Sequence, residues 1–191
     1  MTKKGILFVV SGPSGSGKTT LCRQVEQHLR IPHSVSYTTR APRKGEIEGK
    51  DYHFLSLEKF EEMEKRGEFL ESAWVHGNRY GTALQYTQDI INKGNDLILD
   101  LDTQGALAVK SKIKDAVLIF IDAPDDESLA NRLGQRGTED PEIKAKRLAQ
   151  ASHERSFKEE YHYHVTNDSL EKTLQFIIHV IENERKIKKS T

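Results

Sequence analysis

The sequence lacks the features of secreted, membrane-spanning and nucleic-acid-binding proteins. Its single cysteine, Cys22, cannot form an internal disulfide, so a reducing cytoplasm is the expected compartment. No apolar run approaches the about 20 residues needed to cross a bilayer, and no signal peptide precedes the first apolar segment, so no membrane association is expected. Lys and Arg total 29, as do Asp and Glu, so no overall basic field attracts a nucleic acid polymer.

The order of apolar runs and helical patterns predicts a single α/β domain. Apolar runs at 6–10, 97–101 and 117–121 are typical of strands buried on both faces of a parallel sheet. Helical patterns follow them, ending near 29 and 113, and two more are expected at 141–160 and from 170 onward. We therefore predict a three-layer fold, with helices on both sides of a parallel core sheet and the ligand at the carboxyl ends of its strands.

A phosphate-binding loop (P-loop) is the strongest local signal. Residues 12–19 read Gly-Pro-Ser-Gly-Ser-Gly-Lys-Thr, the pattern G-x-x-x-x-G-K-[ST] between a predicted strand and a predicted helix. Its glycines let backbone N–H groups point at an anion, and the following helix adds its N-terminal donors. Lys18 is expected between the outer phosphates, and the Thr19 hydroxyl on a magnesium ion. The predicted ATP-binding residues here are Gly12, Pro13, Ser14, Gly15, Ser16, Gly17, Lys18 and Thr19.

The loop alone does not separate ATPases, GTPases and kinases. A Gly/Ser-rich turn that ends in Lys-Thr by chance is the other interpretation, and the flanking strand and helix argue against it.

Residues 38–82 are predicted to form a small strand-rich insertion. A short strand is expected just before it, at 33–37. Within it we expect strands at 52–55 and 69–75, a helix from the N-cap Ser56 to Arg66, and a turn at 76–79. Within the polar segment 38–46, Arg40 and Arg43 lie near Ser and Thr hydroxyls. Composition supports two interpretations equally: a solvated loop, or a grip on a small phosphate monoester by guanidinium groups.

Several segments together resemble the guanylate kinase family, over nearly the whole chain and in the family's order and spacing. They are Ser36–Arg43, Gly49–Phe54, Glu68–Glu71, Tyr80–Thr82, Leu99–Gly105 and Arg132–Thr138. The resemblance implies ATP-dependent phosphorylation of GMP to GDP by in-line phosphoryl transfer, in purine nucleotide metabolism and GMP recycling. Mg²⁺ is the implied cofactor with ATP as co-substrate, and a monomer or homodimer is expected.

The resemblance also assigns the acceptor site. The residues implied to hold the GMP phosphate are Ser36, Arg40, Arg43, Tyr52 and Tyr80; those implied to face guanine are Glu71, Thr82 and Asp102. A carboxylate such as Glu71 accepts from both N1–H and the exocyclic amino group of guanine, whereas adenine presents an acceptor at N1. An unpaired buried carboxylate costs about 1–3 kcal/mol or more, which favours guanine by tenfold or better.

The remaining implied roles concern metal, adenine and catalysis. Asp100 is expected near magnesium through its waters, and Asn167 near adenine. No general base is needed, because the acceptor phosphate is already ionised at neutral pH, so catalysis rests on positioning and on cancelling charge. The predicted catalytic cations are Lys18, Arg40, Arg132, Arg136 and Arg147. The expected division is a P-loop core of 1–37 and 83–191, a GMP-binding insertion of 38–82, and a lid of 134–147.

Two other functions are compatible with part of this pattern. Guanylate-kinase-like domains of membrane-associated scaffolds keep the fold without the activity, but the intact P-loop and the lid arginines argue against that function here. A kinase for a phosphorylated sugar would not need base-reading residues such as Glu71 and Thr82. His162 and His164 lie two apart in a predicted strand, which suggests metal binding, but two histidines without a third ligand are more often packing or surface residues.

Overall fold

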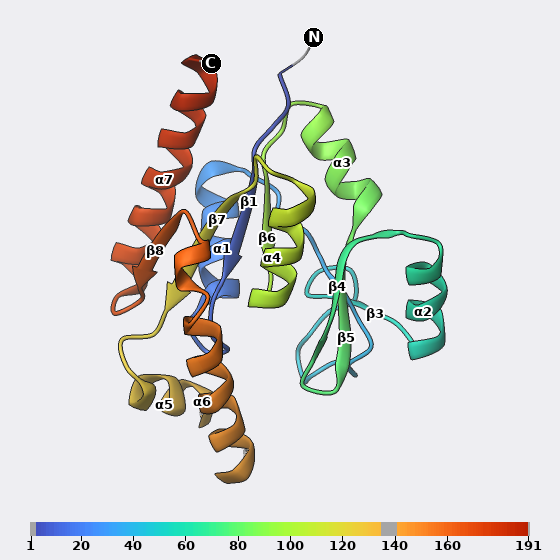
Figure 1. Cartoon of the computed structure of the whole chain (residues 1–191), viewed down its shortest axis with the longest axis vertical. Coiled ribbons are helices and arrows are strands. Elements are labelled where there is room, and N and C mark those ends of the chain that lie inside the picture. The colour runs from blue at the N-terminus through green and yellow to red at the C-terminus, as the bar shows by residue number, and fades with distance from the viewer. Residues whose placement is uncertain (1–2, 135–140, 191) are drawn as a thin grey trace.

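The computed structural model describes residues 3–134 and 141–190, which form two sheets with helices around them (Figure 1). The core sheet has the strand order β6 (Leu97–Asp100), β1 (Leu7–Ser11), β7 (Val117–Asp122) and β8 (Tyr163–Thr166). All its neighbouring strands are parallel. The predicted parallel core sheet is therefore confirmed.

Helices cover both faces of the core sheet, because successive strand residues point to opposite sides. Phe8 and Val10 of β1 belong to the apolar cluster that includes α1 (Lys18–Leu29) and α7 (Leu170–Ser190). Leu7 and Val9 belong to a second cluster with α4 (Thr103–Lys112), against which residues of α3 (Leu84–Asn92) also pack. The continuous apolar runs are thus explained by burial on both faces, and the predicted three layers are confirmed.

The second sheet is smaller and of mixed direction. Its order is β3 (His53–Phe54), β2 (Tyr37–Thr38), β5 (Asn78–Ala83) and β4 (Phe69–Val75). The covering helix α2 (Leu57–Lys65) begins as predicted, with the Ser56 side chain accepting from the Lys59 N–H at 3.2 Å. Phe60 of α2 is fully buried and its ring stacks on Phe69, with centroids 4.5 Å apart.

One local prediction was wrong and two were right in kind but too long. Residues 33–37 do not form a continuous strand: His33 makes a single bridge to Ile98 of the core sheet, and β2 starts at Tyr37 in the second sheet, because the chain crosses between the sheets here. The turn expected at 76–79 consists of His76 and Gly77 alone, both with positive φ, as a two-residue hairpin turn requires. The helix expected at 141–160 divides into α6 (Pro141–Arg155) and a short 3₁₀ turn (Lys158–Glu160).

The elements beyond β7 complete the chain. Helix α5 (Asp126–Gly134) packs on α6 through a small cluster of Ala123, Leu129 and Ala151. His162, the residue before β8, is exposed and accepts a hydrogen bond from the Leu118 N–H through Nδ1, at 3.0 Å. His164 is exposed.

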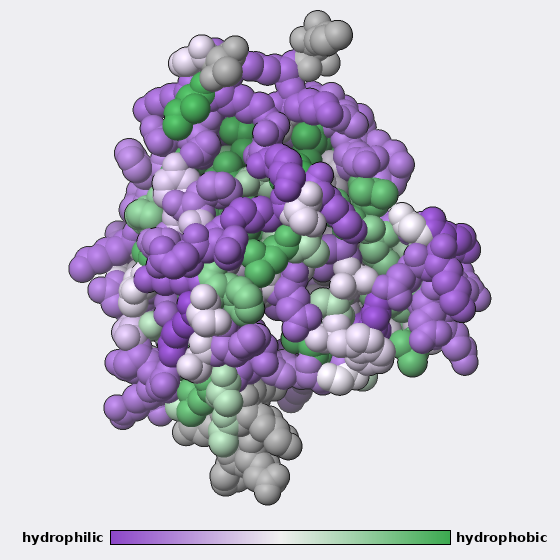
Figure 2. Space-filling view, in the orientation of Figure 1, coloured by the Kyte–Doolittle hydropathy of each residue, from purple (hydrophilic) through white to green (hydrophobic). Residues whose placement is uncertain are grey.

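Hydrophilic residues cover most of the face seen in Figure 2, and apolar residues appear there as separate patches. Over the part of the chain that the structure describes, we found no helix with the length and apolar character needed to cross a bilayer.

Candidate active site

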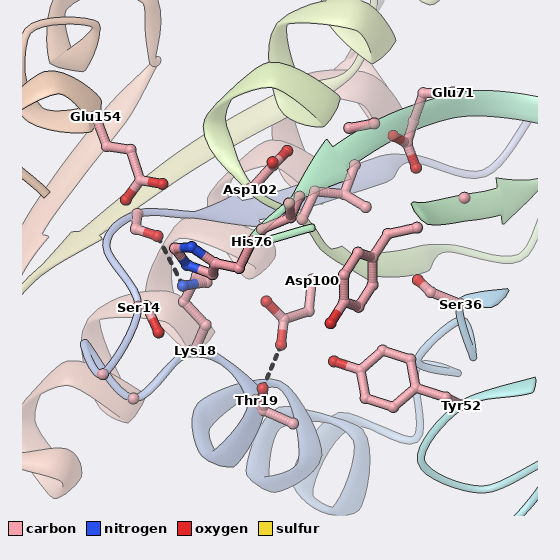
Figure 3. Close-up of a pocket in the computed structure, with 18 of the residues that line it drawn as sticks. Ser14, Lys18, Thr19, Ser36, Tyr52, Glu71, His76, Asp100, Asp102 and Glu154 are labelled. Carbon is pink, nitrogen blue, oxygen red and sulfur yellow. Dashed lines mark hydrogen bonds between the residues drawn. The ribbon is translucent and has the colours of Figure 1, made fainter. Parts of the chain in front are cut away.

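A cavity of about 190 Å³ lies between the P-loop and the second sheet. One wall is formed by the P-loop and the start of α1, and the opposite wall by β4, β5 and the residue before β3 (Figure 3). The ends of β6 and the N-terminus of α4 form the side between them, where Asp100 and Asp102 face the cavity. Elements far apart in the sequence therefore bring cations, hydroxyls and acids to one place.

The P-loop backbone depends on close packing beneath it. Gly12 has a φ of 137°, and a Cβ atom at this position would lie 2.0 Å from the Ile121 carbonyl oxygen, so only glycine fits. The Lys18 ammonium donates to the carbonyl oxygens of Gly12 at 2.7 Å and Pro13 at 2.9 Å. These bonds place the lysine charge at the edge of the loop, beside the cavity.

Thr19 and Asp100 form an oxygen-rich pair next to this lysine. The Thr19 hydroxyl donates to Asp100 Oδ2 at 2.5 Å (Figure 3). A hydroxyl and a carboxylate are the hard ligands that magnesium prefers. Within residues 3–134 and 141–190 there is no cluster of three or more His, Cys, Asp or Glu suited to a metal ion.

Burial strongly affects two acids of the cavity, Glu71 on the opposite wall and Asp102 on the side between the walls. Glu71 is 5% exposed, and burial raises the pKa of its carboxyl to about 7, although the hydrogen bond from the Thr82 hydroxyl, at 2.7 Å, acts in the other direction. Asp102 caps α4 by accepting from the Gly105 N–H at 2.7 Å. Burial raises the pKa of Asp102 as well, against that bond. The two carboxyls lie close together, because a Cβ atom at Gly105 would lie 2.8 Å from Glu71 Oε2 and 3.2 Å from Asp102 Oδ1. The negative charge of Asp102 also raises the pKa of Glu71.

Arg40 is held in place by several partners. Its guanidinium donates to Glu46 Oε1 at 2.8 Å and to the Tyr80 hydroxyl at 3.2 Å, and it lies 5.3 Å from the centre of the Tyr52 ring. Burial alone would raise the pKa of Glu46, but the bonds from Arg40 and from the Arg43 N–H outweigh it, so the pKa is below its ordinary value. Glu46 therefore remains a carboxylate, and it holds both the Arg40 side chain and the Arg43 backbone in place.

The predicted site residues fall into two groups. Those lining the cavity are Gly12, Ser14, Gly15, Gly17, Lys18, Thr19, Ser36, Arg43, Tyr52, Glu71, Tyr80, Asp100 and Asp102. A second group forms hydrogen bonds to the lining residues or to one another: Pro13, Ser16, Arg40, Thr82, Arg132 and Asn167. Arg136 lies outside the described residues, and Arg147 belongs to α6 but its side chain is also outside them.

Asn167 and Arg132 support the P-loop from behind. Asn167 is 2% exposed and donates from Nδ2 to the Ser16 carbonyl oxygen at 2.7 Å. Arg132 donates to the Asn167 carbonyl oxygen at 3.0 Å. The predicted contact of Asn167 with adenine stays a prediction, and the structure adds a bracing role that the sequence did not suggest.

Three titratable residues in or near the cavity were missed by sequence reasoning: Glu46, His76 and Glu154. Glu154 is 7% exposed and points from α6 toward the P-loop (Figure 3). Its Oε2 has no hydrogen-bond partner within the described residues, and burial raises its pKa. His76 reaches the cavity from the hairpin turn of the second sheet. Nothing in the local sequence separates Glu154 from the other acids of a polar helix.

Comparison with known proteins identifies the family. The family described as "Guanylate kinase" matches residues 4–184. A guanylate kinase of Clostridium tetani (strain Massachusetts / E88) is 44% identical over 183 residues, covering 96% of this chain and 88% of the relative. The chain belongs to the guanylate kinase family. Guanylate kinases are ATP:GMP phosphotransferases, so the chain is a transferase that converts GMP to GDP.

Further relatives agree with this assignment. A guanylate kinase of Geobacter metallireducens (strain ATCC 53774 / DSM 7210 / GS-15) is 42% identical over 188 residues, covering 97% of this chain and 92% of the relative. The crystal structure of guanylate kinase from Anaplasma phagocytophilum superimposes with a TM-score of 0.82 at 35% identity, covering 96% of this chain and 87% of that one. The guanylate kinase fold thus extends over both sheets.

Proposed function

We propose that the cavity is where the guanylate kinase reaction takes place, with ATP on the P-loop and GMP against the second sheet. One observation carries this assignment: a single cavity has Lys18 and Thr19 on one wall, the buried acid Glu71 on the other and the partly buried acid Asp102 between them. The first pair has the chemistry for phosphates, and the second pair the chemistry for the N–H edge of guanine. A terminal phosphate and an acceptor phosphate would meet between them.

On the ATP side, backbone N–H groups of residues 12–19 would hold the phosphates, and Lys18 would exchange its two carbonyl partners for phosphate oxygens. Thr19 would hold magnesium directly and Asp100 through a water, which the oxygen-only donor pair supports. The bound ion offsets negative charge on the phosphates. Asn167 is assigned to the adenine end of the site.

On the GMP side, Glu71 would accept from N1–H and the amino group of guanine. The Thr82 hydroxyl orients this carboxylate, and Asp102 completes the polar wall. Because burial makes the free carboxylate costly, two donors from guanine would stabilise it strongly. Adenine cannot supply both donors, which gives the specificity.

The acceptor phosphate is assigned to Arg40 and Arg43, with hydroxyls of Ser36, Tyr52 and Tyr80. Arg40 already uses its donors on Glu46, Tyr80 and the Ala41 carbonyl oxygen, so it would exchange some of them for phosphate oxygens. Glu46 therefore preorganises the guanidinium before the phosphate arrives. Less side-chain entropy is then lost on binding.

The chemical step would rest on alignment and charge. The acceptor is an ionised phosphate, so no proton has to be removed from it, and the attacking oxygen needs only to face the terminal phosphorus in line. Lys18, Arg40 and Arg132 would cancel charge as it develops, together with Arg136 and Arg147.

The proposed organisation follows from these roles. Residues 38–82 would bind GMP, residues 1–37 and 83–191 would form the P-loop core, and residues 134–147 would act as a lid over ATP. The second sheet extends from Tyr37 to Ala83, which supports the bounds proposed for the GMP-binding segment. The single cysteine also supports action in the cytoplasm, in purine nucleotide metabolism.

The test is a coupled assay of the chain with ATP, magnesium and a panel of nucleoside monophosphates. GMP is expected to turn over far faster than AMP, because only guanine satisfies Glu71. Omitting magnesium or replacing it with a chelator should abolish turnover. No turnover with any monophosphate would instead indicate a scaffold-type binding domain, and turnover without base preference would contradict the assignment of Glu71 and Thr82.

A further inference from the structure

A second cavity, of about 560 Å³, lies at the end of the core sheet opposite the P-loop. It is lined by residues 3–6 before β1, by 30–32 after α1, by 94–96 before β6, and by the last turns of α7. Figure 1 shows the N-terminal segment and the C-terminal end of α7 at the same end of the molecule. Strand β1 starts beside this cavity and ends at the P-loop, so the two sites lie at opposite ends of the same strand.

Hydrogen bonds between separate segments fix the walls of this cavity. Asp96 accepts from the Ile6 N–H at 2.7 Å and from Arg185 Nε at 2.6 Å. Lys188 donates to the Gly5 carbonyl oxygen at 3.0 Å. A Cβ atom at Gly5 would lie 1.8 Å from the Asn95 carbonyl oxygen, so the N-terminal segment packs directly on the turn before β6. The walls of the cavity are therefore held together by side-chain hydrogen bonds and by close backbone packing.

Positive charge is concentrated around this cavity. Its lining contains Lys3, Lys4, Arg30, Arg185, Lys188 and Lys189. Asp96 is the only acid among the lining residues, and it is already paired with Arg185, so six cations less one acid give a formal charge of +5. Because the whole chain carries equal numbers of acidic and basic residues, this is a local excess and not a reflection of overall composition.

Helix ends account for only part of the excess. Helices α1, α3 and α7 all end near the cavity, and cations are favourable there because each helix C-terminus carries roughly half a negative charge. Three such ends offset about 1.5 positive charges, which leaves a residual of about +3.5. This residual attracts an anion with several charges.

The floor of the cavity has a different character from its rim. Ile6 and Ile31 are buried beneath it, and Ile90 and Pro32 are partly exposed to it. A volume of this size with an apolar floor and converging charged groups is typical of small-molecule sites. An occupant with several negative charges and one flat apolar ring fits both the rim and the floor.

We propose that this cavity binds a nucleoside polyphosphate, with its phosphates on the lysine and arginine rim and its base on the isoleucine floor. This site is separate from the cleft that holds ATP and GMP, and it does not depend on the roles proposed for that cleft.

Calorimetry on the full chain tests the proposal once the cleft is filled. A bisubstrate in which adenosine and guanosine are joined through five phosphates would be added at one equivalent, so that it fills the cleft and leaves none free for the second cavity, and ATP would then be titrated. One further equivalent of ATP is expected to bind, with an affinity that falls as salt is raised. Absence of a second binding event would overturn the proposal.

Two double variants of equal net charge locate the site. Lys4→Gln with Lys189→Gln removes two rim charges that carry none of the wall hydrogen bonds described above, and is expected to weaken the second event about tenfold. Lys65→Gln with Lys114→Gln removes two exposed lysines elsewhere and is expected to leave it unchanged. Equal weakening in both would mean non-specific attraction and would refute the site. Normal guanylate kinase turnover in each variant checks that the chain has folded.

Inorganic triphosphate tests the floor. It carries the charges without a ring, so it is expected to bind about tenfold more weakly than ATP. Equal affinity for the two would refute the assignment of the base to the isoleucine floor.

Discussion

Binding of GMP should release a proton from Glu71, and this is the sharpest consequence of the buried acid. The ordinary pKa of a glutamate is 4.5, and burial raises that of Glu71 to about 7. At about pH 6 its carboxyl is therefore about 90% protonated, whereas the donors of guanine require the ionised form. GMP affinity should thus fall as pH drops below about 7, and about 0.9 proton should leave Glu71 per GMP bound at about pH 6.

Calorimetry in two buffers of different ionisation enthalpy counts these protons. GMP itself also releases a proton near this pH, because the second pKa of a phosphate monoester is about 6. Glu71→Gln keeps the side-chain shape and isolates that contribution, so the difference between the two proteins reports Glu71 alone. Equal proton release by both proteins at about pH 6 would refute the reasoning.

The same shift predicts the pH dependence of stability. A folded-state pKa above the unfolded value means that the folded chain keeps its proton while the unfolded chain loses it, so stability falls as pH rises from about 4.5 to about 7. With 1.36 kcal/mol per pKa unit, the loss is on the order of 3 kcal/mol. Denaturant unfolding should show this fall in the parent chain and not in Glu71→Gln. Thr82→Val removes the bond that lowers the pKa, so it should move the window to higher pH.

Three other substitutions probe the remaining parts of the cleft. Lys18→Ala should lower kcat by at least about 100-fold with GMP affinity retained, and normal turnover with weakened GMP binding would contradict the P-loop assignment. Asp100→Asn should raise the magnesium concentration needed for half-maximal turnover, measured by titration with magnesium, because Thr19 keeps its hydroxyl but loses its charged partner. Glu154→Gln should raise the melting temperature at about pH 8 and not at about pH 4. Burial makes the ionised carboxyl of Glu154 costly, and this cost arises only above the unfolded pKa of the group. The same gain in melting temperature at both pH values would contradict this.

Local patterns were sufficient wherever short-range chemistry decides the structure. The P-loop, the apolar runs of β1 and β7, and the Ser56 cap could be predicted because glycine spacing, two-faced burial and capping are properties of a few neighbouring residues. The prediction of a strand at 33–37 was wrong because the chain crosses from one sheet to the other here. The alternation of polar and β-branched residues suggested one strand, and only the pairing of His33 with Ile98 shows where the crossing lies.

The sequence by itself determined the α/β fold, the P-loop and, through family resemblance, the reaction of a guanylate kinase. Tertiary structure alone decided which distant residues share the cleft and how they are charged. It brought Glu154 beside the P-loop, fixed Arg40 through Glu46, and moved the pKa of Glu71 to about 7. It also gathered lysines from both ends of the chain around one cavity. These outcomes depend on burial and on long-range packing, and neither is a property of neighbouring residues.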